Sequence, residues 1–231
     1  MLTTAPVAHT RAAGPWLVLA EGGTDADASV RVRWRFGHHR ASEQLNRSVR
    51  SMVAREWIED IIRAHPDEFD GWNGFAHSSS TDRPHLQGAD VDASISHSGD
   101  ALLVAVVAGG MIGVDVELPP FSAFGSRTLV RRMCHPDELA RLTGLPESLR
   151  RRALARLWTA KEALAKADGR GLALDFRTIT PPWNVPARTR SSDLPEAHIA
   201  IIRDVGTVVL PLHLPSTRSS GFAGPSPRRS S

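Results

Sequence analysis

The sequence contains one cysteine, only two lysines and no long run of apolar residues. A lone Cys134 excludes an internal disulfide and favours a reducing compartment. The apolar stretch near the N-terminus, Trp16 to Ala20, is too short for the core of a signal peptide. No run approaches the roughly 18 residues that span a bilayer. We therefore expect a cytoplasmic protein with no membrane partner.

Lysine is scarce in a way that draws attention to one segment. Of the 28 basic residues only Lys161 and Lys166 are lysines, and they lie five positions apart. Codon bias can explain arginine elsewhere, but a compact ammonium differs chemically from a planar guanidinium, so these two positions merit inspection. The net charge is only +3 and the arginines are dispersed, so we expect no nucleic-acid partner.

The length of 231 residues, with 41% hydrophobic and 23% charged residues, suits one core or two small subdomains. Residues 1–29 predict an irregular segment with one short strand, and residues 216–231 predict a disordered tail rich in Ser, Gly, Pro and Arg. Val30 to Phe36 alternates apolar residues with arginines and predicts a half-buried strand. A helix over Ser42–Arg63 follows, and residues 65–93 are typical of a long loop.

The second half predicts a hairpin and then helices. Ala101–Ala108 and Met111–Leu118 are apolar runs separated by Gly109-Gly110, a strong hairpin signal. Pro136 marks a helix start, and a longer helix over Glu147–Ala167 should end at Gly169. Weaker strands are expected at Phe176–Thr180, His198–Arg203 and Val208–Leu212.

Asp115 and Glu117 stand two apart in the apolar strand MIGVDVEL, so their carboxylates share a face. Adjacent buried carboxylates repel each other unless a cation lies between them, and such oxygen ligands suit Mg²⁺. The alternative interpretation is an edge strand whose polar face is solvated. On the long helix, Trp158, Glu162 and Lys166 lie one above another, although a Glu–Lys pair at this spacing is also common on plain surface helices.

Ser96 and His97 fall in the segment SISHSGD, just before the first strand of the expected hairpin. In that hairpin Val104 faces Asp115 and Leu102 faces Glu117, so His97 would lie beyond the end of the ladder that holds Glu117. Hydroxyls, an imidazole and backbone N–H groups there could receive an anion, although a lone loop histidine is more often a structural residue.

These ordered segments, SHS, GVDVE and WTAKEALAKADGRGL, resemble the Sfp-type 4′-phosphopantetheinyl transferases over roughly residues 30–180. The family motifs are (V/I)G(I/V)D(V/I)E and WxxKEAxxKxxGxGL. The segment from Arg132 to Glu138 is similar to the family's RxFxxxE, with Met133 in place of phenylalanine. The resemblance implies an α/β (α+β) fold of two pseudo-two-fold subdomains, here residues 30–108, on the side of the coenzyme A phosphates, and 109–215, with the metal site.

The resemblance also implies roles for single residues. Asp115, Glu117 and Glu162 match the Mg²⁺ ligands; Glu162 and Lys166 match catalytic residues, with Glu162 as general base and Lys166 near the pyrophosphate. The residues matching coenzyme A contacts are Arg33, Arg35, Arg47, Arg83, Ser96, His97 and Lys166.

The implied activity is Mg²⁺-dependent transfer of 4′-phosphopantetheine from coenzyme A to a serine of an apo acyl, peptidyl or aryl carrier protein by a monomeric enzyme. A carboxylate takes the serine proton, directly or through water, and 3′,5′-ADP leaves. Two alternatives remain: another Mg²⁺-dependent phosphoryl-group enzyme such as a hydrolase, and a catalytically silent carrier-protein or nucleic-acid binder.

Overall fold

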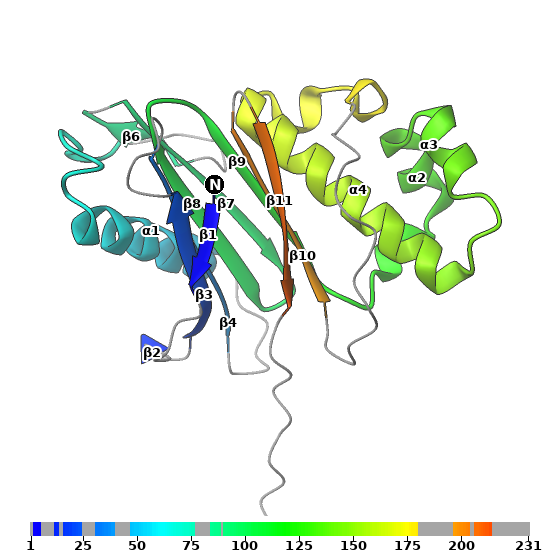
Figure 1. Ribbon diagram of the computed structural model, residues 1–231, viewed down its shortest axis with the longest axis horizontal. Helices are drawn as coiled ribbons and strands as arrows, with labels where there is room; N and C mark the ends of the chain where they lie inside the picture. The colour runs from blue at the N-terminus through cyan, green and yellow to red at the C-terminus, as the bar shows by residue number, and fades with distance from the viewer. Residues whose placement is uncertain are drawn as a thin grey trace, which may run out of the picture.

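The fold is a stack of two sheets between two long helices. The computed structural model describes residues 2–5, 12–13, 16–24, 31–39, 47–76, 84–88, 90–179, 196–203 and 206–213. Helix α1 (Arg47–Ala64) covers the outer face of the larger sheet, and helix α4 (Glu147–Asp168) covers that of the smaller one (Figure 1). These helices and sheets confirm the expected mixture of helix and sheet. Every strand pairing in the described residues is antiparallel.

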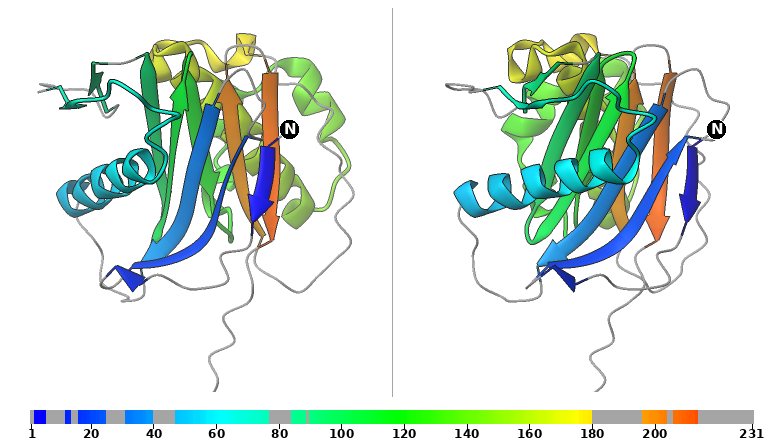
Figure 2. Two further views of the ribbon diagram at one scale, coloured as in Figure 1. Left: turned by 60° about the vertical axis from the view of Figure 1, so that its left-hand side comes forward. Right: turned by 90° about the vertical axis from the view of Figure 1, so that its left-hand side faces the viewer.

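The larger sheet has the strand order β1-β3-β4-β8-β7, with β2 paired to β3. Its strands are β1 (Leu2–Ala5), β2 (Ala12–Ala13), β3 (Trp16–Thr24), β4 (Arg31–His39), β7 (Val91–Ser98) and β8 (Ala101–Ala108). Figure 2 shows α1 lying across this sheet. The first 24 residues therefore contain more strand than the sequence predicted, because β1 and β3 pair with each other and β3 pairs with β4.

Strand β4 confirms the predicted alternation. Val32, Trp34 and Phe36 are buried between the two sheets, whereas Arg31, Arg33 and Arg35 are half-buried. The stripe predicted for the following helix is confirmed in part, since Val53, Trp57 and Ile61 are buried against the larger sheet. Residues 42–46, where that helix was predicted to begin, lie outside the described residues.

The predicted hairpin is wrong. Strand β8 pairs with β4 on one edge and with β7 on the other, so neither edge is open to β9 (Ile112–Glu117). Gly109-Gly110 instead carries the chain over to the second sheet, in which β9 pairs with β10 (Glu196–Arg203) and β10 with β11 (Gly206–His213). The partners predicted for Asp115 and Glu117 are therefore wrong as well. His97 lies inside β7, opposite Leu102, rather than in a loop.

Side chains of β7 join the two sheets. Alternate backbone N–H groups of β9, and that of Leu118 just after it, donate to every second side chain of β7: Ile112 to Asp92 Oδ2 (2.8 Å), Val114 to Ser94 Oγ (3.1 Å), Val116 to Ser96 Oγ (3.3 Å) and Leu118 to Ser98 Oγ (3.3 Å). We call this set the serine seam. It satisfies the donors of a buried strand, which would otherwise destabilise the fold, and it fixes the register of β9 against β7.

Helix α4 packs closely on β9 because Gly113 has no side chain. A Cβ at this position would lie 1.9 Å from the carbonyl oxygen of Ala163 and 2.5 Å from the amide nitrogen of Ala167. Gly113 shares its strand face with Asp115 and Glu117. The close contact thus brings the helix over both carboxylates.

The helical region is held by a buried ammonium. Helices α2 (Arg127–Met133) and α3 (Pro136–Arg141) precede α4, and α3 begins at Pro136 as predicted. Lys161, fully buried on α4, donates to the carbonyls of Met133 and Phe176 at 2.8 Å and to Glu138 Oε2 at 2.7 Å. The end of α2, the start of α3 and the segment after α4 therefore meet at one nitrogen atom.

The remaining predictions for the C-terminal half of the chain are confirmed in part. Helix α4 begins at Glu147 and ends at a left-handed Gly169, as predicted. The strands expected near His198–Arg203 and Val208–Leu212 are confirmed as β10 and β11. The strand expected at Phe176–Thr180 is wrong, because Phe176–Thr178 forms the 3-10 helix η3, with its first turn capped by Asp175. Shorter elements are β5 (Gly74–Phe75), β6 (Leu86–Gln87), η1 (Ser122–Gly125) and η2 (Gly171–Ala173).

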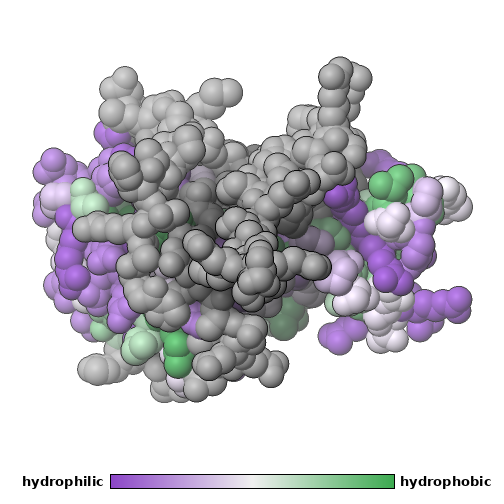
Figure 3. Space-filling view, turned by 90° about the horizontal axis from the view of Figure 1, so that it is seen from below, coloured by the Kyte–Doolittle hydropathy of each residue, from purple (hydrophilic) through white to green (hydrophobic). Residues whose placement is uncertain are grey.

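No helix among the described residues combines the length and apolarity needed to cross a bilayer. On the face seen in Figure 3, the coloured part of the surface is largely hydrophilic, and apolar residues form small patches. The 216–231 segment lies outside the described residues.

Replacing Gly113 with alanine should destabilise the fold by about 1–3 kcal/mol or more, because the new methyl group overlaps backbone atoms of α4 that cannot move independently. Chemical denaturation measures the loss. Gly125→Ala is the matched control, since its Cβ would meet only the mobile guanidinium of Arg151, at 3.0 Å. Equal stability of the two variants would contradict the close packing of α4 on β9.

Lys161→Met should reduce the free energy of unfolding by about 3–5 kcal/mol, since it leaves the buried Glu138 carboxylate without its neutralising cation and removes a hydrogen bond to two carbonyls. Arg63→Met, which removes an exposed ion pair with Glu59, should cost less than about 1 kcal/mol. A similar small loss in both variants would show that Lys161 does not hold this region together.

Candidate functional site

A cavity of about 470 Å³ lies where α1, β7, β9 and α4 meet. It is lined by acidic residues from β9 and α4 and by basic and polar residues from α1 and β7: Arg47, Arg50, Ser51, Ile95, Ser96, His97, Asp115, Glu117, Glu162 and Lys166. Seven residues predicted from the sequence are therefore brought together, from elements as far apart in the chain as α1 and α4.

Asp115 is the most enclosed carboxylate of the cavity, with 3% of its surface exposed. Its Oδ1 accepts hydrogen bonds from Ser96 Oγ at 2.7 Å and from Lys166 Nζ at 2.9 Å. Its Oδ2 is buried and has no hydrogen-bond partner among the described residues. A buried, unpaired carboxylate oxygen is costly, so this atom is suited to bind a cation.

The pKa values of Glu117 and Glu162 are both raised from 4.5 to about 7. In each case burial is the larger cause, and the negative charge of Asp115 is the next. Glu117 accepts a hydrogen bond from Ser98 Oγ at 3.1 Å, and Glu162 accepts one from Trp158. Both surroundings thus disfavour the negatively charged form of these acids.

Lys166 provides the positive charge nearest to these acids. Its Nζ lies 2.9 Å from Asp115 Oδ1 and 3.5 Å from Glu162 Oε1, and it also donates to the carbonyl of Val114 at 3.1 Å. Burial lowers the pKa of Lys166, but the two carboxylates outweigh that effect, so the net shift is upward. The ammonium therefore stays charged at the centre of the cluster.

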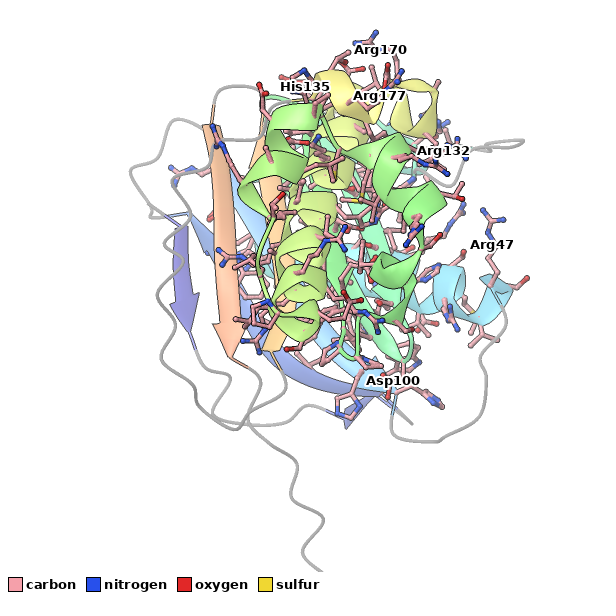
Figure 4. All side chains as sticks on the ribbon, turned by 90° about the vertical axis from the view of Figure 1, so that its right-hand side faces the viewer. Arg47, Asp100, Arg132, His135, Arg170 and Arg177 are labelled. Atoms are coloured by element: carbon pink, nitrogen blue, oxygen red, sulfur yellow. The ribbon has the colours of Figure 1, made fainter. Side chains whose placement is uncertain are left out.

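The opposite wall is basic. Arg50 Nη1 lies 3.4 Å from His97 Nδ1, and the buried Arg50 Nε has no partner among the described residues. Burial, and then the charges of Arg50 and Lys166, lower the pKa of His97. Arg47 projects from the first turn of α1, on the same side of the molecule in this view as Arg132 of α2 (Figure 4). Such donors facing a cavity suit an anionic ligand.

Arg50 lines the cavity although no prediction from the sequence named it. Arg50 lies beside the apolar stripe of α1, and no motif marks it. Arg33 forms an ion pair with Glu68, with Nε 2.8 Å from Oε2, and Arg35 pairs with Glu21 and Asp60. Neither lines the cavity, because side chains distant in the sequence hold both elsewhere. Arg83 lies outside the described residues.

The predicted three-carboxylate metal site is assembled only in part. Asp115, Glu117 and Glu162 share one cavity, but no three His, Cys, Asp or Glu side chains among the described residues are spaced to hold a metal ion. The ammonium of Lys166 stands between Asp115 and Glu162, which accounts for part of this spacing.

A larger hollow of about 750 Å³ is lined in part by Trp158. Trp158 stacks on Phe176 with ring centroids 5.0 Å apart, and apolar residues and arginines complete the walls. The only carboxylate in this lining is that of Asp175, which is paired with Arg177. The carboxylate cluster therefore belongs to the smaller cavity.

Comparison with known proteins agrees with this location. Residues 111–203 match the model of the 4′-phosphopantetheinyl transferase superfamily. The protein slr0495 of Synechocystis sp., provisionally named a 4′-phosphopantetheinyl transferase, is 32% identical over 92 residues, which cover 40% of this chain and 37% of that protein. The 4′-phosphopantetheinyl transferase HetI of Nostoc sp. is 40% identical over 81 residues, covering 35% of this chain and 33% of HetI.

The chain thus spans about a third of the length of each of these relatives in the match. The matched segment includes β9 and α4, which supply Asp115, Glu117, Glu162 and Lys166. Residues 111–203 of this chain are therefore similar to the 4′-phosphopantetheinyl transferase superfamily.

Proposed function

We propose that this protein transfers the 4′-phosphopantetheine group of coenzyme A to a serine of an apo acyl, peptidyl or aryl carrier protein and releases 3′,5′-ADP. The observation that carries the proposal is the cavity in which three carboxylates and Lys166 face a basic wall, within and beside the segment that matches the superfamily. A phosphate-rich substrate requires both features: cations for its charge and acids for a metal and a proton.

Mg²⁺ is the proposed cofactor, and the chemistry of the oxygen donors present suits it. Asp115 Oδ2 is a buried oxygen with no partner in the described residues, and the raised pKa values of Glu117 and Glu162 support the proposal of a further cation at the cluster. Asp115, Glu117 and Glu162 would hold the ion with oxygen ligands of the kind that Mg²⁺ prefers. When bound, it would neutralise charge on the pyrophosphate as the phosphorus is attacked.

The remaining residues take roles according to their place. Lys166 and the basic wall of Arg47, Arg50 and His97 would bind the phosphates of coenzyme A. Glu162, hydrogen-bonded to Trp158, would accept the proton of the carrier serine, directly or through water. The serine oxygen would attack the β-phosphorus, and the bond to the departing 3′,5′-ADP would break.

The layered architecture supports a division of the chain into two similar subdomains. One helix covers each sheet, α1 over the larger and α4 over the smaller, as a pseudo-two-fold pair of subdomains at 30–108 and 109–215 would require. We further propose that the protein acts as a cytoplasmic monomer, in the synthesis of secondary metabolites.

Transfer is tested by incubating the protein with coenzyme A, Mg²⁺ and an apo carrier protein and then measuring the mass of the carrier. Asp115→Asn and Glu162→Gln should each slow the transfer by about a hundred-fold or more. The first change removes a proposed metal ligand, and the second removes a proposed metal ligand that is also the proposed base. Asp168→Asn, an exposed carboxylate at the end of the same helix, should keep full activity. Coenzyme A cleavage without gain of mass by any carrier would indicate a hydrolase instead.

Stabilisation by Mg²⁺ should grow with pH. In the metal-free protein Glu117 and Glu162 have pKa values of about 7 against 4.5 for the unfolded chain, so the folded state binds more protons between these values. Its stability therefore falls as pH rises through this window. Mg²⁺ competes with those protons and should raise the melting temperature more at about pH 8 than at about pH 6. Thermal denaturation with and without Mg²⁺ measures this, and an equal shift at both pH values would contradict metal binding at the cluster.

A further inference from the structure

We propose that Ser96 and Ser98 are positioning residues that orient the metal-binding carboxylates, in addition to joining the two sheets. This inference rests on the proposed function. Each hydroxyl makes two hydrogen bonds in opposite roles: it accepts a backbone N–H from β9 or from the residue just after it, and it donates its own proton to a carboxylate of β9. The resemblance to known transferases suggested coenzyme A as the partner of Ser96, but its hydroxyl points into the seam.

The geometry at Ser96 selects one oxygen of Asp115. Ser96 Oγ is held by the N–H of Val116 at 3.3 Å and donates to Asp115 Oδ1 at 2.7 Å. Lys166 binds the same oxygen, so Oδ2 is the oxygen left unpaired. A hydroxyl proton shared with Oδ1 fixes the rotation of the carboxylate and keeps Oδ2 available, which is how outer hydrogen bonds commonly orient metal ligands.

The next position of the seam repeats the arrangement. Ser98 Oγ is held by the N–H of Leu118 at 3.3 Å and donates to Glu117 Oε2 at 3.1 Å. Because residues two apart on β7 lie opposite residues two apart on β9, the two serines meet the two acids in register. Thus the contact that sets the register of β9 also sets the direction of both its carboxylates.

Ser94 provides an internal control. It accepts the N–H of Val114 at 3.1 Å and is buried, as Ser96 is. The β9 residue that corresponds to Asp115 and Glu117 at this position is Gly113, which has no carboxylate to orient. Ser94→Ala therefore removes the same kind of bond to the backbone without affecting a metal ligand.

The test measures Mn²⁺ affinity by electron paramagnetic resonance of the free ion, with the full chain alone and with coenzyme A. Ser96→Ala should weaken Mn²⁺ binding about ten-fold, the lower end of the range for lost outer partners of metal ligands. Ser94→Ala should lower the melting temperature as much as Ser96→Ala does but leave Mn²⁺ affinity unchanged. Ser98→Ala should also weaken binding, and Ser98→Thr, which keeps the hydroxyl on a half-buried strand position, should restore it.

Equal Mn²⁺ affinity in Ser94→Ala, Ser96→Ala and wild type would overturn the proposal for Ser96 while the proposed function stands. If Ser96→Ala does not fold, the pair Ser98→Ala and Ser98→Thr decides, and equal affinity in these two would overturn the proposal. A wild-type protein that neither binds Mn²⁺ nor modifies a carrier would contradict the proposed function itself.

Discussion

The serine seam is the constraint on which the rest of the structure depends. Strand β9 is buried, with Ile112, Val114 and Val116 almost without exposed surface, so its N–H groups on the β7 side require partners within the protein. Hydroxyl and carboxylate side chains of β7 supply them in place of a backbone ladder. This register places the face of β9 that carries Gly113 and Asp115 against α4. Gly113 allows the helix to pack closely there, and Asp115 contacts Lys166.

The two lysines show how one chemical group serves two purposes. Lys161 is wholly enclosed, and its compact ammonium matches three acceptors arranged around a single point, a geometry that a planar guanidinium would not fit. Lys166 lies about one turn further along α4 and meets two carboxylates at the cavity. The scarcity of lysine in an arginine-rich chain therefore pointed to two real positions, although it could not say which one is structural.

Sequence patterns correctly predicted the structural features that depend on neighbouring residues. The alternation in β4 and the glycine at the end of α4 were interpreted correctly, because burial of one strand face and helix termination depend on neighbouring residues. The Gly109-Gly110 pair led to a wrong prediction of a hairpin, because β8 pairs with β4, about 70 residues earlier in the chain. Arg33 and Arg35 lie away from the cavity for the same reason, since Glu68 and Glu21, which pair with them, come from other parts of the chain.

The carboxylate cluster is the place where the structure departs most from ordinary rules of burial. Three acids share one nearby ammonium, two of them have pKa values raised to about 7, and one buried oxygen has no partner in the described residues. A fold selected only for stability would replace such groups with apolar ones or pair them fully. Departures of this kind concentrate at functional sites, where the missing partner is a ligand. The electrostatic imbalance of the metal-free cavity is therefore itself an argument for a cation, independent of the similarity to known transferases.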